Sequence, residues 1–206
     1  MKRFQLITEA DARLLDYGST VVLETGGHVT PLALDTLNAR RVSVIREGTD
    51  VDAEALAPPS RIRTVAIAGD HTGVALKKAL VHYLRGKGMA VHDLGTETSD
   101  PVDYPDTAVS VAVQVSRGEA DAGIVIDGSG MGSAIAANKI KGIRAAMCLN
   151  QTLARYARQH NGANVLALGS TLVTTEEAVP IVDAFIDTSM REPRYMRRLA
   201  KIRDLE

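Results

Sequence analysis

The sequence contains a single cysteine, Cys148, among its 206 residues, and this excludes an internal disulfide framework. A lone cysteine is typical of a protein from a reducing compartment. Cys148 lies in the apolar, strand-like run 143–149. We therefore expect its thiol to be buried and chemically inert.

An excess of charge of one sign is also missing. The chain has 24 Lys and Arg residues against 25 Asp and Glu residues, which leaves a formal net charge of −1. This balance excludes a general attraction to nucleic acid or to a membrane surface, so any affinity for anions must be local. No apolar run is long enough to span a bilayer, and the N-terminus has no signal-peptide pattern. The five histidines have no metal-ligand spacing. We expect a protein of the cytosol, or of a compartment inside it, that binds no metal.

The apolar content of 45% is ample for a core, and the pattern divides the chain in two. In residues 1–48 we expect a helix that begins at Thr8, a short strand at 20–23, a turn at Gly26-Gly27, a helix from Thr30 to about residue 40, and a strand at 42–45. This is a small α+β extension. Residues 49–62 are acidic and end near Pro58-Pro59, which predicts a linker.

Residues 63–206 alternate between apolar strand-like runs and helical periodicity, which predicts a doubly covered parallel sheet. In the first helix, Leu76, Leu80 and Leu84 indicate the buried face, and Lys77 and Lys78 are assigned to other faces. The last helix, within 191–206, is basic. Ligands of such sheets bind at the carboxyl ends of the strands.

The most informative stretch is 121–139. Residues 123–126 read as a strand buried on both faces, and the following Asp-Gly-Ser-Gly-Met-Gly cannot continue it, because its glycines open positive φ angles. Residues 133–137 are small and compatible with a helix. A glycine loop between a strand and a helix directs backbone N–H groups at the strand end, where they stabilise an anion. Asp127 at the strand tip is then either a turn-capping residue, the commoner role before glycine, or a functional carboxylate.

Several motifs occur in order in the second part of the chain: Ala-Gly-Asp-His-Thr-Gly at 68–73, Asp-Tyr-Pro-Asp at 103–106, the glycine loop with Ala-Ile-Ala-Ala-Asn-Lys to residue 139, Gly-Ile-Arg-Ala-Ala at 142–146, and Arg-Gln-His-Asn at 158–161. Together they resemble the type B ribose-5-phosphate isomerase and galactose-6-phosphate isomerase family over about 64–203. The resemblance implies a Rossmann-like three-layer α/β/α fold with a five-stranded parallel sheet over 63–206. It also implies no cofactor, and a homodimer or dimer of dimers whose active sites lie between subunits.

The resemblance also implies roles for individual residues. Asp127 and Ser129 stand at catalytic positions, and His160 matches the histidine assigned to sugar-ring opening. Arg194 and Arg198 match phosphate-binding arginines, and their i, i+4 spacing places them on one helix face. The remaining positions implied to bind the substrate are Asp70, His71, Tyr104, Gly128, Gly130, Gly132 and Asn161.

The chain departs from the family pattern at its general base. The family commonly has cysteine at the position of Asp127, and a branch without it has a glutamate at the position of Ser133. We expect Asp127 to replace the base and to transfer a proton between C2 and C1 through a cis-enediolate. An aspartate is a weak base near its ordinary pKa of ~3.9, so this role requires surroundings that raise the value.

A second departure is Thr171, where the family usually has a phosphate-contacting arginine. It leaves the sugar open: a pentose phosphate is expected first, with tetrose and hexose phosphates, or an epimerase reaction, as alternatives. A sensor or scaffold that binds a sugar phosphate without turnover is the non-enzyme alternative. The 1–48 extension loosely resembles those on bacterial microcompartment enzymes, which implies a targeting or assembly role with a shell or cargo partner.

Overall fold

The computed structural model describes residues 2–46 and 57–206 and divides into two compact units, Met1–Ala55 and Leu56–Glu206. Most of the expected linker, 49–56, lies outside the described residues. No helix in the described part of the chain is long and apolar enough to cross a membrane. Each unit is built on its own parallel sheet.

The first unit is a small α/β layer in which two helices alternate with three parallel strands. Thr8 caps the first helix in a capping box with Asp11, and Thr30 caps the second through the Ala33 N–H, as the sequence predicts. The strand order is β1-β2-β3. The elements are β1 (Arg3–Ile7), α1 (Glu9–Arg13), β2 (Thr20–Val29), α2 (Pro31–Ala39) and β3 (Ser43–Arg46).

The expected turn at Gly26-Gly27 is wrong, because β2 continues through both glycines to Val29. The pairing register between β1 and β2 shifts between Phe4 and Leu6. Gly26 has a φ of 75°, a left-handed conformation that lets the strand absorb extra residues as an irregularity and then resume pairing. The glycine pair thus correctly indicates a left-handed backbone conformation, but the chain does not reverse its direction there.

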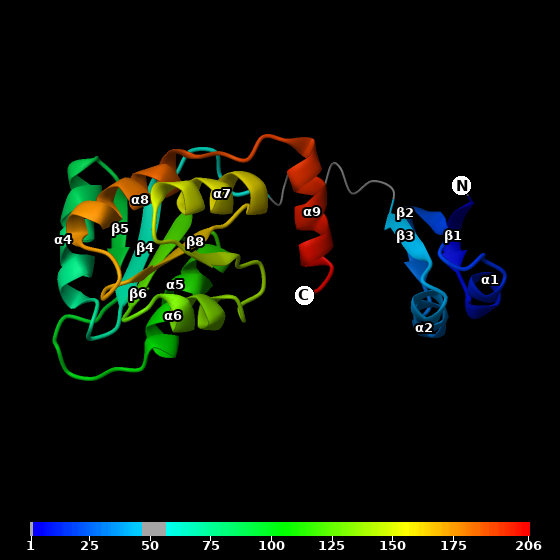
Figure 1. Ribbon diagram of the computed structural model, residues 1–206, viewed down its shortest axis with the longest axis horizontal. Coiled ribbons are helices and arrows are strands. Elements are labelled where there is room, and N and C mark those ends of the chain that lie inside the picture. Colours follow the sequence, from blue (N-terminus) through cyan, green and yellow to red (C-terminus); the bar gives the residue numbers. More distant parts are fainter. Residues whose placement is uncertain (1, 47–56) are drawn as a thin grey trace. The chain divides into compact units, whose positions relative to one another are not determined.

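The second unit has the predicted three-layer α/β/α fold around a five-stranded parallel sheet of order β5-β4-β6-β8-β7. Helices α4, α7 and α8 cover one face of the sheet, and α5 and α6 cover the other (Figure 1). The strands are β4 (Thr64–Gly69), β5 (Ala90–Asp93), β6 (Ala122–Asp127), β7 (Ala145–Met147) and β8 (Val165–Gly169). The helices are α4 (Val74–Gly86), α5 (Tyr104–Ser116), α6 (Met131–Ala137), α7 (Gln151–Asn161), α8 (Thr175–Asp187) and α9 (Pro193–Arg203).

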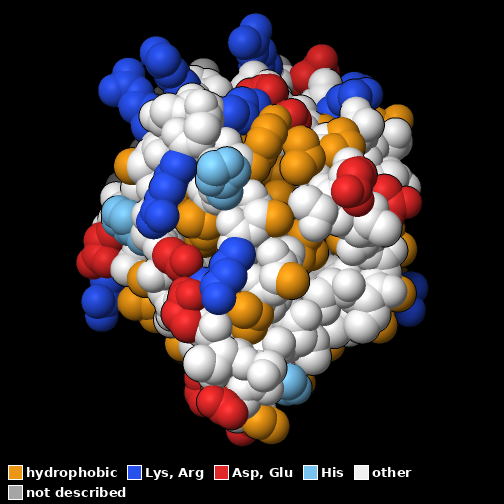
Figure 2. Space-filling view, turned by 90° about the vertical axis from the view of Figure 1, so that its left-hand side faces the viewer, with side chains coloured by type: hydrophobic (Ala, Val, Ile, Leu, Met, Phe, Trp, Pro, Cys, Tyr) orange, Lys and Arg blue, Asp and Glu red, His pale blue; other side chains and the backbone are white. Residues whose placement is uncertain are grey.

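The two faces of the central strands have different side chains. On β4, Val65 and Ile67 pack toward α4 and α8, whereas Ala66 and Ala68 pack toward α5. The small residues let the α5 and α6 side lie close to the sheet, which brings the glycine loop and the start of α5 together. On the surface shown in Figure 2, Lys and Arg side chains are interspersed with Asp and Glu around a group of apolar side chains.

Cys148 follows β7 directly and is 1% exposed, as expected. Burial raises the pKa of its thiol to about 11, so the thiolate is scarce at neutral pH.

Candidate active site

Predicted site residues gather at the carboxyl ends of β4, β6 and β8. We call this group the carboxyl-end cluster: Asp70 and His71 after β4, Tyr104 at the start of α5, and Asp127 with the loop 128–132 after β6. The parallel register places Gly69 beside Ile126 and Asp127 beside Gly169, so these loops emerge at one edge of the sheet. The cluster therefore follows from the topology, as the rule for open α/β sheets predicts.

The Asp127 carboxylate is held by the glycine loop itself. Its Oδ1 accepts hydrogen bonds from the backbone N–H of Ser129, at 2.7 Å, and of Gly130. Its Oδ2 accepts from the N–H of Ser133, at 2.7 Å. The side chain belongs to a residue that is only 4% exposed. The anion that the loop amides bind in this structure is thus the aspartate of the chain.

The surroundings do not raise the pKa of Asp127, so the condition that the sequence analysis set for a strong base is not met. Burial alone would raise the pKa, but the side-chain contact with Ser133 and the backbone N–H groups of Ser133, Gly130 and Ser129 together lower it below the ordinary value of an aspartate. A carboxylate that accepts several N–H bonds is favoured in its charged form. Asp127 is therefore ionised at neutral pH and is a weaker base than an aspartate in water.

The loop amides are consequently not all available to a ligand. Besides the three that bind Asp127, the Met131 N–H donates to Ser129 Oγ at 3.3 Å. The N–H groups of Gly128 and Gly132 have no acceptor in the part of the chain that the structure describes. These two amides remain for the oxygen of a substrate, fewer than the sequence pattern suggested.

Tyr104 lies against the glycine loop. A Cβ atom at Gly132 would come within 2.7 Å of Tyr104 Cε2 and Cζ, so only glycine permits this contact. The tyrosine residue is 41% exposed, which leaves part of the ring accessible to a ligand. Gly132 therefore positions an aromatic side chain in addition to shaping the loop.

Asp70 and His71 have different partners. Asp70 Oδ1 accepts from the N–H groups of Thr72 and Gly73 and from the Thr72 hydroxyl, at 2.6–3.2 Å, so this oxygen shapes the turn after β4. The His71 Nδ1 accepts the Val102 N–H at 3.3 Å. In the neutral ring the proton is then on Nε2, which is the nitrogen left to donate.

Two hydroxyl groups at the end of β8, those of Ser170 and Thr171, border this cluster. Ser170 Oγ lies 3.1 Å from Thr72 Oγ1, and the Thr171 hydroxyl donates to the Gly128 carbonyl at 2.6 Å. Thr171 thus fastens the glycine loop to β8. The Thr171 side chain is neutral, and its hydroxyl is already hydrogen-bonded within the protein.

The other predicted residues form a second group at the opposite end of the sheet, which we call the amino-end cluster: His160 and Asn161 at the end of α7, with Arg194, Tyr195 and Arg198 on α9. His160 stacks between Tyr156 and Tyr195, with ring centroids 4.6 and 4.5 Å away. The Arg194 and Arg198 guanidinium carbons lie 4.7 and 5.7 Å from the centroid of the Tyr195 ring. Both arginine side chains belong to exposed residues.

One chain does not bring the two clusters together. Asn161 precedes the amino end of β8, whereas Gly169 at its other end pairs with Asp127. The five residues of β8 cover roughly 13 Å along the strand. Asn161 therefore contributes nothing to the loop 128–132 of its own chain, and the same holds for His160, Arg194 and Arg198.

Sequence reasoning missed the role of Lys77. Its residue is fully buried, and Nζ bonds to Asp93 Oδ1 at 2.5 Å and Glu97 Oε1 at 2.6 Å. Lys77 therefore attaches the loop before α5, which carries Val102 and leads to Tyr104, to the first turns of α4. Its spacing from Val81 and Leu84 is helical, and this places it on the buried face. Tyr156 and Tyr195 were also missed.

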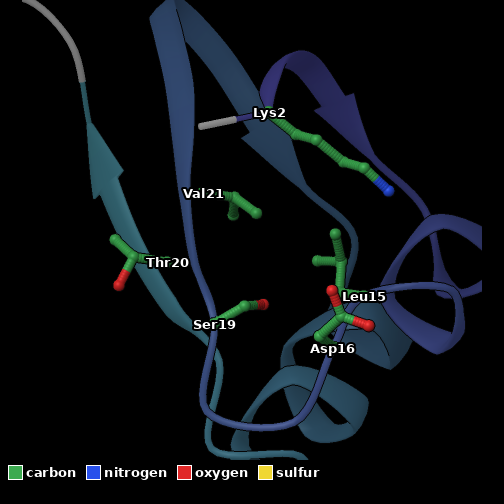
Figure 3. A pocket seen from close by; sticks show the side chains of 6 residues that line it. All are labelled: Lys2, Leu15, Asp16, Ser19, Thr20 and Val21. Carbon is green, nitrogen blue, oxygen red and sulfur yellow. The ribbon is translucent and has the colours of Figure 1, made fainter.

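Among residues 2–46 and 57–206, His, Cys, Asp and Glu side chains form no group of three or more that could hold a metal ion. The first unit contains a pocket of about 220 Å³ (Figure 3). The buried Ser19 hydroxyl has no hydrogen-bond partner in the described part of the chain and points toward the side of Leu15 and Asp16. None of the predicted site residues lines this pocket, whose lining is Lys2, Leu15, Asp16, Ser19, Thr20 and Val21.

The second unit has a Rossmann-like α/β fold, and the carboxyl-end cluster is its candidate site, beyond the ends of the strands. Residues 65–202 match the family model described as Ribose/Galactose Isomerase, so the chain belongs to that family. Within it the protein is a sugar-phosphate isomerase, an aldose-ketose isomerase by class.

Individual relatives support this placement. The chain is 43% identical over 145 residues to ribose-5-phosphate isomerase B of Escherichia coli strain K12, an alignment that covers 70% of this chain and 97% of the relative. Among solved structures, ribose-5-phosphate isomerase B of Clostridium thermocellum has a TM-score of 0.68 at 44% identity, covering 69% of this chain and 96% of that one. The enzyme of Mycoplasma genitalium, solved with bound ribulose-5-phosphate, has a TM-score of 0.66 at 42% identity, covering 69% and 95%.

Proposed function

We propose that the protein interconverts an aldose phosphate with its ketose, with ribose 5-phosphate and ribulose 5-phosphate as the first candidates. The observation that supports this most is the carboxyl-end cluster, which gathers a carboxylate, a serine hydroxyl, a tyrosine and two unused amides around one loop. The M. genitalium relative, whose structure contains ribulose-5-phosphate, supports the choice of a pentose phosphate.

In the proposed reaction, Asp127 Oδ2 is the base, since it accepts one hydrogen bond from Ser133 and retains a lone pair. It removes the proton from C2 of the open-chain aldose, the C1 oxygen becomes an enediolate oxygen, and the same carboxyl group returns the proton to C1. Ser129 Oγ moves the second proton between the two substrate oxygens. The Gly128 and Gly132 amides stabilise the negative oxygen.

We further propose that each complete site needs two copies of the chain. The amino-end cluster has a histidine and two exposed arginines but no partner for them at the carboxyl-end cluster of its own chain. Large apolar side chains are exposed on α6, on α7 and beside them, and a twofold contact would bury them. They are Met131, Ile135, Leu149, Leu153, Tyr156 and Leu172.

Solvent proton exchange tests the chemistry directly. Incubation with ribose 5-phosphate in D₂O should place deuterium at C1 or C2 of the recovered sugars. While the enediolate exists, the base holds the abstracted proton and can exchange it for solvent deuterium before it returns it to carbon. If neither label nor turnover is found although the sugar phosphate binds, the isomerase proposal is contradicted and only the binding role remains.

That binding role is the second candidate, and the filled loop favours it. A carboxylate that already satisfies three loop amides has a lowered pKa and is a stable structural anchor. In a sensor or scaffold the sugar phosphate would bind over this anchor without reaction. Asp127→Cys separates the two candidates, because it restores the family's usual base and vacates the loop amides. Activity gained only in Asp127→Cys would assign the native chain to binding.

The identity of the sugar is proposed from relatives alone, and Thr171 bears on it. Because threonine is neutral, position 171 offers no cation to a phosphate, and its hydroxyl is already bonded to the Gly128 carbonyl. A panel of four-, five- and six-carbon aldose phosphates, scored by kcat/KM, distinguishes the tetrose, pentose and hexose alternatives. Preference for a four- or six-carbon sugar by tenfold or more would replace the pentose assignment.

For the first unit we propose a targeting or assembly role in the cytoplasm or a bacterial microcompartment. The family match begins at residue 65, so the isomerase relatives account for none of residues 1–46. Removal of residues 2–46 should leave kcat/KM unchanged, because the second unit corresponds to nearly the whole length of those relatives. A collapse of activity would instead assign the first unit a part in the site.

A further inference from the structure

A short segment that lies outside the family match contacts the amino-end cluster. We call residues 57–60 the strap; they precede the matched region, which begins at residue 65. Ala57 packs against the buried group formed by Met190, Tyr195 and Leu199 on and before α9. The strap is therefore attached to the second unit at the helix that carries the two exposed arginines.

Pro58 packs where α7 ends. The residue is buried, and a Cβ atom at Gly162 would lie 3.3 Å from Pro58 Cδ and 2.7 Å from Leu199 Cδ1. Gly162 directly follows the last residue of α7. The strap, the end of α7 and α9 thus meet at a point where an added side chain would displace the Leu199 methyl groups.

Arg158 adds a polar connection. It is fully buried, and its guanidinium donates to three carbonyl oxygens: Pro59 at 3.0 Å, Ala163 at 2.8 Å and Thr188 at 3.2 Å. Burial lowers its pKa to about 10, so it remains charged at neutral pH. A buried cation needs all its hydrogen bonds satisfied, and one of its acceptors belongs to the strap.

Both connections lead to His160. Arg158 lies two residues before it on α7, and Tyr195, which shares a cluster with Ala57, stacks on its ring at 4.5 Å. If the strap loosens, the hydrogen bond from Arg158 to the Pro59 carbonyl and the packing of Ala57 against the Tyr195 group are lost together. The His160 ring could then adopt orientations that stacking on Tyr195 prevents.

We propose that the strap is a positioning segment that fixes the orientation of the His160 ring through Tyr195 and Arg158. It touches no reacting atom. The functional consequence rests on the proposed part of His160 in the isomerase site, whereas the orientation of the ring does not. The two adjacent prolines restrict the backbone that presents the Pro59 carbonyl, which suits a segment of this kind.

The test uses the full chain with Ala57→Gly, Pro58→Ser and Pro59→Gly combined. The matched control carries Val51→Gly, Asp52→Ser and Ala53→Gly, which changes the same number of linker residues outside the strap. The first readout, which needs no substrate, is the ¹H–¹³C NMR signal of the His160 ring, identified with His160→Gln. Ring currents from Tyr156 and Tyr195 displace this signal, and the strap variant should move it toward that of a free histidine.

The second readout is steady-state isomerisation of ribose 5-phosphate. We expect kcat to fall by roughly 10- to 10²-fold, the scale for a misplaced catalytic group, with KM changed less than threefold. The control should match the parent in both readouts. Pro58→Gly alone is the milder variant, for use if the triple variant unfolds.

An unchanged His160 signal in a folded strap variant would overturn the proposal. A displaced signal with unchanged kcat would refute the catalytic consequence, and a parent protein without turnover would refute the proposed function while the NMR comparison still decided the role of the strap.

Discussion

At the scale of single residues, Asp127 organises the glycine loop of the candidate site. Its two oxygens accept hydrogen bonds from three backbone N–H groups, so it caps the loop, and the proposed reaction uses the same carboxylate as a base of low pKa. Of the two interpretations that the sequence left open, the hydrogen bonds confirm the capping role, and the catalytic role stays a proposal. The loop is organised around a charge that the family's usual cysteine would not supply.

The lowered pKa gives a pH dependence with a definite sign. A base must be unprotonated, so a lowered pKa means that kcat/KM should show no acid limb from Asp127 in the neutral and weakly acid range. The same carboxylate contributes stability that is present above its unfolded pKa and is lost as the pH falls through the folded value. Measured activity that is flat between pH 5 and 7 agrees, provided that the substrate phosphate is treated as a separate titration. An acid limb near pH 6 that disappears in Asp127→Asn would contradict the lowered pKa.

Asp127→Asn should reduce kcat by about 10²–10⁴-fold, the range for general-base catalysis. The asparagine also places an NH₂ group where one of the two carboxylate oxygens accepted a backbone N–H, from Ser133 or from Gly130. One hydrogen bond is then lost and the other is weaker, so a stability loss of about 1–3 kcal/mol is expected. Asp121→Asn is the matched control, because Asp121 Oδ2 accepts the N–H groups of Arg63 and Thr64 at the other end of the same sheet. Equal kcat losses in the two variants would remove Asp127 from the chemistry.

At the scale of elements, the site depends on how closely α5 approaches the glycine loop. Tyr104 is the first residue of α5, and its ring occupies the space where Gly132 lacks a side chain. The loop before α5 is in turn attached to α4 by Lys77 and reaches His71 through Val102. Tyr104 and His71 are thus positioned by the same segment, 94–103.

Gly132→Ala should displace Tyr104, because the added Cβ meets the ring carbons at 2.7 Å. Overpacking of this kind typically costs 1–3 kcal/mol, so we expect KM for the sugar phosphate to rise by roughly tenfold, with a smaller effect on kcat. Gly86→Ala is the control, since an added Cβ atom at this position, the last residue of α4, would meet no atom within 4 Å. If both variants bind substrate equally well, Tyr104 does not line the pocket.

At the scale of the whole molecule, the separation of the two clusters is the basis of our proposal that a complete site needs a second chain. Complementation between inactive variants tests this. His71→Ala changes the carboxyl-end cluster and His160→Ala the amino-end cluster, so each variant alone should have little activity. When equal amounts are unfolded and refolded together, half of the dimers are mixed and each has one intact site, which restores about a quarter of the parent activity.

The control for this experiment mixes His71→Ala with Ser129→Ala, because both change the carboxyl-end cluster and no mixed dimer has an intact site. Recovery in the control as well, or in neither mixture, would show that the two clusters do not meet across a subunit contact.

The sequence by itself determined the order of the elements and the sheet type. Strand-forming runs, capping residues such as Thr8 and Thr30, and the ordered motifs act locally, so their meaning survives without tertiary information. The family, the three-layer fold and the gathering of Asp70, Tyr104 and Asp127 at one edge of the sheet follow from that order. Gly26 shows the limit, because a positive φ suits a turn and a strand irregularity equally well.

Only the tertiary structure decided what the site residues contact. Whether a strand-tip carboxylate is free or bound depends on where the next six residues place their N–H groups, and in this chain they enclose Asp127 and lower its pKa. The burial of Lys77, the stacking of His160 between two tyrosines and the distance between the clusters likewise depend on packing between segments far apart in sequence. Such contacts arise from the close packing of the whole chain, and no local pattern of residues encodes them.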